Sequence, residues 1–256
     1  HRARLYVGHN MRHMAFVRKM KALIDGGAIG EVKACWCRHF VGHGGDFYFR
    51  DWHAERRYTN GLLLQKAAHD IDVIHWLCGG YSRTVNALGG LTLYGGLPGR
   101  KPAVKGPRKV TPAEMDWKLF PPAKMRGLNH RIDVEDLSSM QMQLDNGVFA
   151  TYAQCHYTPD YWRNYTVIGT EGRLENFGNG EPGTHLRLWN RRASWKDRGD
   201  RTYRIPLERG SHGGADPKIM AEFLRYVRTG GHTDTSPLAA RESIAAGCAA
   251  TDSLRA

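Results

Sequence analysis

The sequence predicts an α+β fold in which a large, open and mainly antiparallel β-sheet carries helices on one face. Residues 137–206 contain a succession of short alternating strands, and the turn Asp145-Asn146-Gly147 between the first two is a strong hairpin signal. Two helical segments follow with no strand between them. Strands grouped first and helices afterwards, without a repeated strand–helix alternation, are typical of α+β proteins.

The N-terminal residues predict a strand, a turn and a helix. The short apolar run Leu5–Gly8 indicates a strand, and Asn10 is a candidate N-cap for a helix whose apolar residues recur at helical spacing over 14–24. We expect Gly26-Gly27 to end this helix. The alternation over Val32–Val41 then predicts a second strand.

The next segment alternates between irregular and periodic stretches. Residues 43–60 are rich in Gly, Arg and aromatic residues without a clean period, which predicts a loop. A helix is expected over Leu62–Leu77, because its apolar residues recur at helical spacing up to Gly79-Gly80. Thr84–Tyr94 indicates a strand, and the proline-rich and basic residues 95–128 indicate a long surface excursion.

The second half of the chain supplies most of the predicted sheet and the last two helices. The strands are expected at Leu137–Leu144, Val148–Gln154, Tyr165–Gly169, Arg173–Phe177, Leu186–Asn190 and Tyr203–Pro206. Each helix has an N-cap residue followed by proline at its first position: Asp216 precedes Pro217–Arg228, and Ser236 precedes Pro237–Leu254.

Composition excludes some classes of function. The 256 residues are 41% apolar, enough to bury a core, and no run of 18 apolar residues predicts a membrane span. The net charge of +12 raises nucleic acid as a partner. The densest basic runs, Arg100–Lys109 and Arg191–Arg204, lack a reading motif and aromatic residues at stacking intervals. We therefore expect no nucleic-acid partner, and a basic surface that steers an anionic cofactor or substrate.

The cysteines and the first residues indicate the setting of the protein. Five cysteines, an odd number without disulfide-scaffold spacing, predict structural thiols in a reducing cytoplasm. His1–Tyr6 has neither a starting Met nor the pattern of a signal peptide, so we expect this start to be an internal cut in a longer protein.

The helix over 62–77 concentrates titratable side chains. Lys66, His69 and Asp72 follow one another at i, i+3 spacing and lie on neighbouring stripes of the helix. A carboxylate raises the basicity of an imidazole and an ammonium lowers it, so His69 is predicted to be a general base tuned near neutrality. The competing interpretation is a structural histidine among solvating charges. A metal site from His39, His43, His53 and His69 has no supporting pair spacing, so no metal is expected.

Several motifs occur in one order along the chain. They are Val7–Arg12, Lys21–Gly30, Asp51-Trp52, Asn60–Asp72 with Leu77, and Ile168–Leu174. This succession resembles the glucose-fructose oxidoreductase, inositol dehydrogenase and rhizopine-catabolism (Gfo/Idh/MocA) family. The resemblance implies that residues 1–28 are the last strand and helix of a Rossmann domain. Residues 29–256 are then the substrate-binding, catalytic and oligomerisation domain, and NAD or NADP binds between the two.

The resemblance also implies roles for individual residues. His69 matches the histidine that relays the proton of the substrate hydroxyl while the nicotinamide takes the hydride from carbon. Asn10 and Arg12 match the segment after the nucleotide-binding strands, and Trp52 matches an aromatic residue near the cofactor. His156, Tyr157 and Arg163, after and beside a sheet strand, are candidates to contact substrate hydroxyls, with loop packing as the alternative.

Three departures from the family pattern bear on the site. The Gly-rich phosphate loop and the Glu-Lys-Pro turn are absent. Most members have Asp four residues before the histidine, where this chain has Gln65 followed by Lys66. We hypothesise that Lys66 points at the substrate oxygens or the cofactor, and that Gln65 and Asp72 line the substrate site.

The expected activity is NAD(P)-dependent oxidation or reduction of a secondary alcohol on a sugar, polyol or glycoside, with His69 as acid/base. Two alternatives stay open: cleavage of a glycoside with NAD recycled, and a non-catalytic sugar or nucleotide sensor on the same scaffold. A homodimer or homotetramer that pairs through the sheet is expected from the resemblance.

Overall fold

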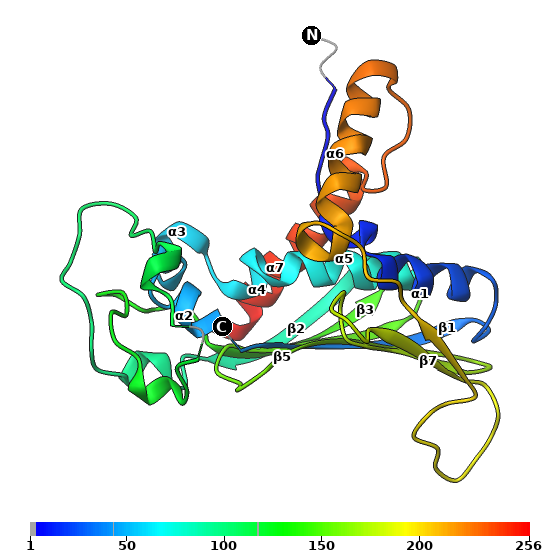
Figure 1. Ribbon diagram of the computed structural model, residues 1–256, viewed down its shortest axis with the longest axis horizontal. Helices are drawn as coiled ribbons and strands as arrows, with labels where there is room; N and C mark the ends of the chain where they lie inside the picture. The colour runs from blue at the N-terminus through cyan, green and yellow to red at the C-terminus, as the bar shows by residue number, and fades with distance from the viewer. Residues whose placement is uncertain (1–3, 43, 117) are drawn as a thin grey trace.

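An eight-stranded open sheet forms the base of the structure, a computed structural model that describes residues 4–42, 44–116 and 118–256 (Figure 1). Its strands are β1 (Val32–Val41), β2 (Ser82–Gly90), β3 (Leu137–Leu144), β4 (Phe149–Cys155), β5 (Tyr161–Gly169), β6 (Arg173–Phe177), β7 (His185–Trp189) and β8 (Arg201–Arg204). Their order is β2-β3-β4-β1-β5-β6-β7-β8, and β1 with β4 is the parallel pair among them. The prediction of a large, mainly antiparallel open sheet is confirmed.

The longer helices lie on one side of this sheet, as predicted, and the short helices of the excursion lie beyond one end of it (Figure 1). They are η1 (Asn10–His13), α1 (Ala15–Asp25), α2 (Gly44–Tyr48), η2 (Trp52–Ala54), α3 (Arg56–Thr59), α4 (Leu62–Gln65), α5 (Ala67–Cys78), η3 (Tyr94–Gly96), η4 (Pro112–Glu114), η5 (Pro122–Lys124), α6 (Ser211–Thr229) and α7 (Pro237–Arg255). α7 packs on β2 and on α5, and α1 packs on α5. The opposite face of the sheet stays open, apart from the loop between β7 and β8 that extends below it.

Side-chain alternation explains why the strands bury one face. β3 alternates strictly between exposed and buried residues, and β1 buries Cys35, Cys37 and His39 toward the helices. The main core forms where these strands meet α1, α5 and α7. A second apolar cluster lies under α2 and the excursion, around Phe49 and Tyr94, whose rings stack with centroids 4.1 Å apart. The main core therefore holds α5 against the sheet, and the second cluster holds α4 through Leu62.

The N-terminal prediction needs two corrections. Leu5–Gly8 forms no strand, because it has no strand edge to pair with; the segment runs beside α6, where the Tyr6 hydroxyl donates to Glu222 at 2.9 Å (Figure 1). Asn10 is not an N-cap; it begins η1, and its amide donates to Asp216 Oδ1 at 3.4 Å. The helix itself begins after Met14 and ends before Gly26, close to the predicted position.

The stretch over 43–78 is more helical, and more divided, than predicted. Residues 44–59 contain α2, η2 and α3 rather than a plain loop; His43 lies outside the described residues. The single predicted helix over 62–77 is two helices that meet at Lys66. The residues before this break pack in both apolar clusters: Leu62 lies in the second cluster and Leu63 in the main core. It also places Lys66 at a junction rather than within a continuous helix.

The last two helices differ in how they begin. Ser236 caps α7 as predicted, accepting a hydrogen bond from the Ala239 amide at 3.1 Å. The backbone of α6 is left-handed over 212–214, so its regular helical part begins after Gly214, close to the predicted start at Pro217. Asp216 does not cap it, because its carboxylate binds the His212 ring and the Asn10 amide. Within the described residues, no helix is long and apolar enough to cross a membrane.

Candidate active site

His69 lies in the first turn of α5 with an unpartnered ring nitrogen. Its Nδ1 is buried and has no hydrogen-bond partner among the described residues, and its ring lies 5.6 Å from that of His9. Burial, together with the charges of His9 and Lys66, lowers the pKa of His69 to about 4. The imidazole is therefore neutral at pH 7 and can accept a proton. Its pKa lies below the near-neutral value that the spacing predicted, because burial outweighs the nearby carboxylate.

Lys66 and Gln65 lie next to His69, at the α4–α5 junction. Burial lowers the pKa of Lys66, and the positive charge of Arg163 lowers it further. The Lys66 ammonium stands 5.8 Å from the centre of the Tyr48 ring, a cation–π distance. Gln65 Oε1 is buried and has no hydrogen-bond partner among the described residues. This corner of the fold therefore presents polar groups that the described protein does not satisfy.

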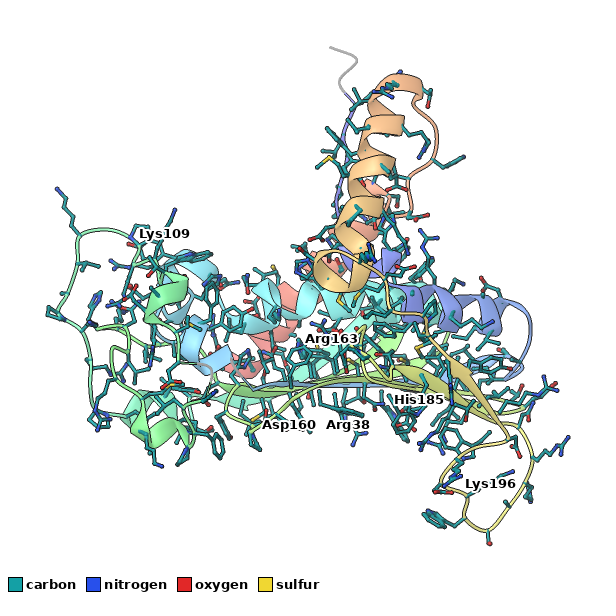
Figure 2. All side chains as sticks on the ribbon, viewed as in Figure 1. Arg38, Lys109, Asp160, Arg163, His185 and Lys196 are labelled. Carbon is teal, nitrogen blue, oxygen red and sulfur yellow. The ribbon has the colours of Figure 1, made fainter. Side chains whose placement is uncertain are left out.

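Beneath Lys66 lies a fully buried carboxylate that the sequence analysis missed. Asp70 Oδ1 is 3.0 Å from Arg163 Nε, Asp70 Oδ2 accepts from His39 Nδ1 at 3.0 Å, and the Tyr165 hydroxyl donates a short hydrogen bond to Oδ1. Burial alone raises the pKa of Asp70, but Arg163 and His39 outweigh it and hold that pKa well below its usual range. Arg163, a predicted substrate contact on the helix side of the sheet (Figure 2), is thus bound by this carboxylate.

A sequence signal for Asp70 existed. It falls on the same stripe of α5 as the buried residues Ala67, Ile71 and Ile74, where a carboxylate needs a buried partner. The predicted stripe of titratable residues, Lys66, His69 and Asp72, does not include it. The partners come from β1 and β5, which no local pattern connects to α5.

Asp72 serves a different contact from the predicted one. Its carboxylate accepts from Arg12 Nε at 2.8 Å and from Arg12 Nη2 at 2.6 Å, and Arg12 Nη1 donates to the Asp234 carbonyl at 2.7 Å. The expected pairing of Asp72 with His69 is therefore wrong, because the guanidinium occupies both oxygens. This bidentate pair fastens η1 to α5 and holds His9 beside His69.

The remaining predicted residues separate into near and distant ones. His156 is fully buried, its Nε2 has no hydrogen-bond partner among the described residues, and its ring lies edge-on to Tyr48 at 5.6 Å. Burial lowers the pKa of His156 to about 3. Tyr157 and Trp52 contact residues outside this corner. The Tyr157 hydroxyl accepts from Thr92 at 3.2 Å, and the Trp52 ring stacks on that of His53 with centroids 3.8 Å apart. The structure thus brings Lys66, His69 and Arg163 together, with His156 behind Tyr48.

Comparisons with known proteins match this architecture. The family model described as "GFO/IDH/MocA C-terminal domain" matches residues 17–175, more than half of the chain. The chain belongs to the Gfo/Idh/MocA family. A relative named as an oxidoreductase, YteT of Bacillus subtilis (strain 168), is 23% identical over 85% of this chain and 59% of its own length.

Solved structures show the same fold for this Gfo/Idh/MocA chain. Levoglucosan dehydrogenase in complex with NADH and levoglucosan superposes with a TM-score of 0.69 at 19% identity, over 97% of this chain and 63% of that one. Aldose-aldose oxidoreductase from Caulobacter crescentus, complexed with glycerol, gives 0.65 at 16% identity, over 99% and 62%. The chain therefore spans about three fifths of the length of these relatives.

Histidines do not gather into a metal centre in the described part of this Gfo/Idh/MocA chain. Two of the four histidines considered as metal ligands are engaged elsewhere. His39 binds Asp70, and His53 Nδ1 lies 2.7 Å from Asp51 Oδ1. A different group, His13 with Glu222 and Asp234, brings ligand atoms within 4.8 Å of one another. Its two carboxylates face different ring nitrogens, and Arg18 binds Asp234. In this structure these three side chains and Arg18 pair with one another.

The buried histidines predict a stability that falls on acidification. The folded pKa values of His39 and His156, about 4 and about 3, lie below the unfolded value of 6.5. The unfolded chain therefore takes up protons that the folded chain rejects as pH falls through 6.5. We expect each imidazole to cost on the order of 2 kcal/mol of unfolding free energy between pH 6.5 and 5.

Thermal unfolding followed by circular dichroism at pH 7.5, 6 and 5 measures this effect. His156→Phe should reduce the loss of Tm between pH 7.5 and 5, whereas His185→Phe, at a half-exposed position in β7, should leave that loss unchanged. A wild-type Tm that is constant from pH 7.5 to 5 contradicts the prediction.

Proposed function

We propose that this chain carries the substrate-binding and proton-transfer part of an NAD(P)-dependent oxidoreductase that acts on a secondary alcohol of a sugar, polyol or glycoside. The observation that carries this proposal is the neutral, unpartnered imidazole of His69 beside the buried ammonium of Lys66. Family membership supports it, as does the likeness to a levoglucosan dehydrogenase solved with NADH. A cytoplasmic location agrees with the free thiols and stays a prediction.

The described residues fit one end of a dinucleotide. His69 Nδ1 and Gln65 Oε1 are buried polar atoms in need of partners, which a substrate hydroxyl and a nicotinamide carboxamide supply. Bound NAD(P) supplies the hydride acceptor or donor. Asn10, Arg12 and Trp52 stay predicted cofactor contacts, and Arg12 acts through the Asp72 pair that holds η1. The assignment of residues 1–28 to a Rossmann domain and 29–256 to the substrate domain also stays a proposal.

The chemistry divides between His69 and the charges around it. Loss of a hydride from the carbon of a secondary alcohol leaves an oxygen whose proton must move, and neutral His69 accepts it. Lys66 stabilises the negative charge that develops on that oxygen, at a site where burial strengthens the interaction. Arg163 stays charged, because Asp70 raises its pKa against the effect of burial, and so adds a fixed positive charge below the oxygen. Gln65 and His156 stay proposed substrate contacts, whereas the Asp72 carboxylate is bound by Arg12 and Tyr157 lies in other surroundings.

A cofactor assay on the complete protein tests this function. Nicotinamide absorbance is followed with a panel of sugars, inositols and glycosides, and products are analysed in parallel. Net reduction of NAD(P) by a sugar or polyol supports the dehydrogenase. Release of an aglycone without net reduction identifies the glycoside-cleaving alternative, and sugar binding without turnover identifies the sensor.

Replacing Lys66 by methionine is expected to lower kcat/KM by about 10²-fold, because a buried donor to the developing alkoxide is lost. The methylene stem is kept, so packing around Tyr48 changes little. Lys105→Met, at an exposed position in the excursion, is the matched control and should leave kcat/KM unchanged. Kinetics for Lys66→Met that equal those of the wild type would exclude its role.

The open face of the sheet is the expected self-association surface, and we propose a homodimer or homotetramer formed through it. Leu88, Trp36 and Phe149 on this face are 74, 51 and 61% exposed, which is unusual for large apolar side chains. Trp36→Asp/Phe149→Asp is expected to give a monomer by light scattering where the wild type is a dimer or larger. A wild-type monomer at micromolar concentration counts against the proposal.

A further inference from the structure

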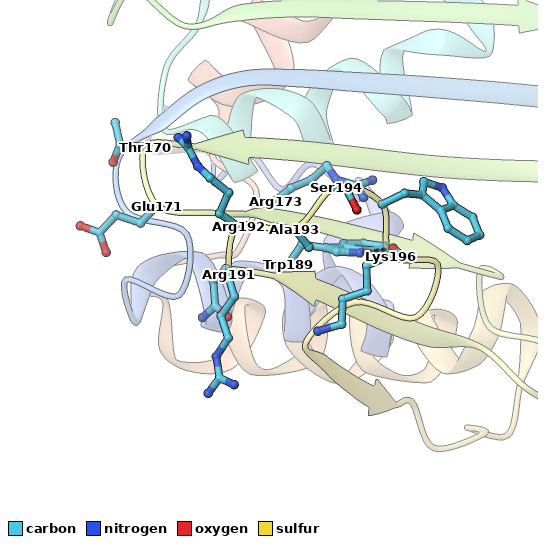
Figure 3. Close-up of a pocket in the computed structure, with 12 residues that line it drawn as sticks. Thr170, Glu171, Arg173, Trp189, Arg191, Arg192, Ala193, Ser194 and Lys196 are labelled. Carbon is cyan, nitrogen blue, oxygen red and sulfur yellow. Dashed lines mark hydrogen bonds between the residues drawn. The ribbon is translucent and has the colours of Figure 1, made fainter.

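A basic hollow lies at the edge of the sheet formed by β6, β7 and β8, and none of its lining residues belongs to the His69 site. It measures about 470 Å³ and lies between the turn from β5 to β6 and the connection from β7 to β8 (Figure 3). Figure 2 places Lys196, in its wall, below the sheet, whereas Arg163 lies on the helix side. The proposed oxidoreductase site does not use it. We call it the β7–β8 hollow and define it by Thr170–Arg173 and Trp189–Lys196.

The connection that walls the hollow is held in shape by its own contacts. The Asp200 carboxylate accepts from the backbone N–H groups of Asn190 and Arg191 at 2.9 and 3.0 Å and from the Lys196 ammonium at 2.5 Å. The Trp189 indole N–H donates to the Lys196 carbonyl at 2.7 Å. These bonds close the connection into a defined loop, so a ligand meets side chains that are already placed.

Positive charge dominates this lining, and two of its cations have no hydrogen-bond or ion-pair partner among the described residues. The lining has four cations and one carboxylate, Glu171. Arg173 already pairs with Glu175 at 2.6 Å and lies over the Trp189 ring at 3.7 Å. Arg191 and Arg192 are exposed, and neither guanidinium has a hydrogen-bond or ion-pair partner among the described residues. The two guanidiniums point to opposite sides of the connection (Figure 3), and each of them, being without a partner, favours a carboxylate or phosphoryl group as ligand.

An exposed indole and neutral polar groups accompany those charges. Trp195 is 83% exposed, which leaves its faces open to water. Asn190, Ser194 and Glu171 line the same hollow, and their side chains make no hydrogen bond or ion pair within the described part of the chain. A flat apolar face beside amide, hydroxyl and carboxylate groups suits a ring that has C–H faces and many hydroxyls. Glu171 disfavours a continuous phosphate backbone, which favours a sugar over a nucleic acid.

We propose that the β7–β8 hollow binds an anionic carbohydrate. Arg191 and Arg192 bind separate carboxylate or phosphoryl groups of the ligand, Trp195 stacks on a sugar ring, and Asn190, Ser194 and Glu171 meet its hydroxyls. No bond is made or broken in this site. It is a binding site separate from the oxidoreductase centre, so it stands or falls independently of the activity of His69.

Calorimetric titration of the purified protein with matched probes tests the proposal. A trisaccharide of β-1,4-mannuronate carries three carboxylates, β-1,4-mannotriose is its neutral counterpart, and mannose 6-phosphate tests the phosphoryl source of the charge. A ten-residue oligothymidylate tests nucleic acid. We expect the trimannuronate or the sugar phosphate to bind and mannotriose to bind at least about tenfold more weakly, since each charge-assisted contact is worth 1.5–3 kcal/mol.

Variants locate the binding. Arg191→Ser/Arg192→Ser and, separately, Trp195→Ala should each weaken the anionic sugar by about tenfold or more. Lys105→Ser/Arg228→Ser removes the same charge from exposed positions elsewhere and should leave binding unchanged. All these positions are exposed, so the fold should survive, as circular dichroism will show. The proposal is overturned if no anionic sugar binds, if only the oligothymidylate binds, or if the control pair weakens binding equally.

Discussion

Replacing Arg163 by methionine is expected to lower the free energy of unfolding by about 3–5 kcal/mol, because it leaves a charged carboxylate buried without its cation. Asp70 is fully buried, and Arg163 Nε lies 3.0 Å from its Oδ1. His39 and Tyr165 also bind Asp70, but neither carries a compensating charge at neutral pH. Methionine keeps much of the volume of the stem, so the cost reports charge rather than packing.

A double-mutant cycle separates the pair from its surroundings. Chemical denaturation of wild type, Arg163→Met, Asp70→Asn and the double variant gives the coupling energy. We expect the double variant to recover a large part of the stability lost in Arg163→Met. Arg38→Met, on the open face of β1 and paired with Glu175 at 3.8 Å, is the exposed control and should cost less than about 1 kcal/mol. A loss of similar size for Arg38→Met and Arg163→Met contradicts the argument.

Replacing His69 by glutamine in the complete protein is expected to lower kcat by about 10²–10⁴-fold, because glutamine cannot accept the hydroxyl proton. This prediction depends on the proposed oxidoreductase function. The fold should be little affected, since Nδ1 of His69 has no hydrogen-bond partner to lose among the described residues. Steady-state turnover by nicotinamide absorbance measures the effect, and thermal unfolding checks the fold.

The pH profile distinguishes a proton acceptor from a structural residue. The folded pKa of His69 is about 4, so wild-type kcat/KM should be flat from pH 8 down to about 5 and fall below that value as the imidazole is protonated. His185→Gln, a half-exposed histidine on β7, should keep both rate and profile. A His69→Gln enzyme that retains wild-type kcat and the acid limb assigns the proton transfer to another group.

Local sequence patterns predicted much of the sheet correctly, for reasons that particular elements illustrate. Strict alternation along β3 follows from one buried and one open face, so its bounds were predicted without error. Asn146-Gly147 forms the hairpin turn, with Gly147 at a φ of 86° that suits glycine. The cap at Ser236 depends on neighbouring residues alone and was also predicted.

Elements that depend on distant partners were the ones predicted wrongly. Leu5–Gly8 has a strand-like composition but lies beside α6, where hydrogen bonds from side chains replace those of a sheet edge. The short helices within 44–59 have little period of their own, and buried contacts such as that of Phe49 with Tyr94 define them. Asp216 lies near the start of the regular part of α6, as predicted, but its carboxylate binds His212 and the distant Asn10 and caps no backbone amide. Long-range packing overrode local preference in each case.

The sequence by itself determined the open-sheet domain, its covering helices and the placement of Lys66 beside His69, because hydrophobic period and helical spacing are local properties. Only the tertiary structure decided which charges meet. It joined Arg12 to Asp72 across 60 residues and buried Asp70 between His39 and Arg163. Burial then kept His69 neutral and lowered the pKa of Lys66. The strength of a charge interaction depends on distance and exclusion of water, which exist only once the chain is folded.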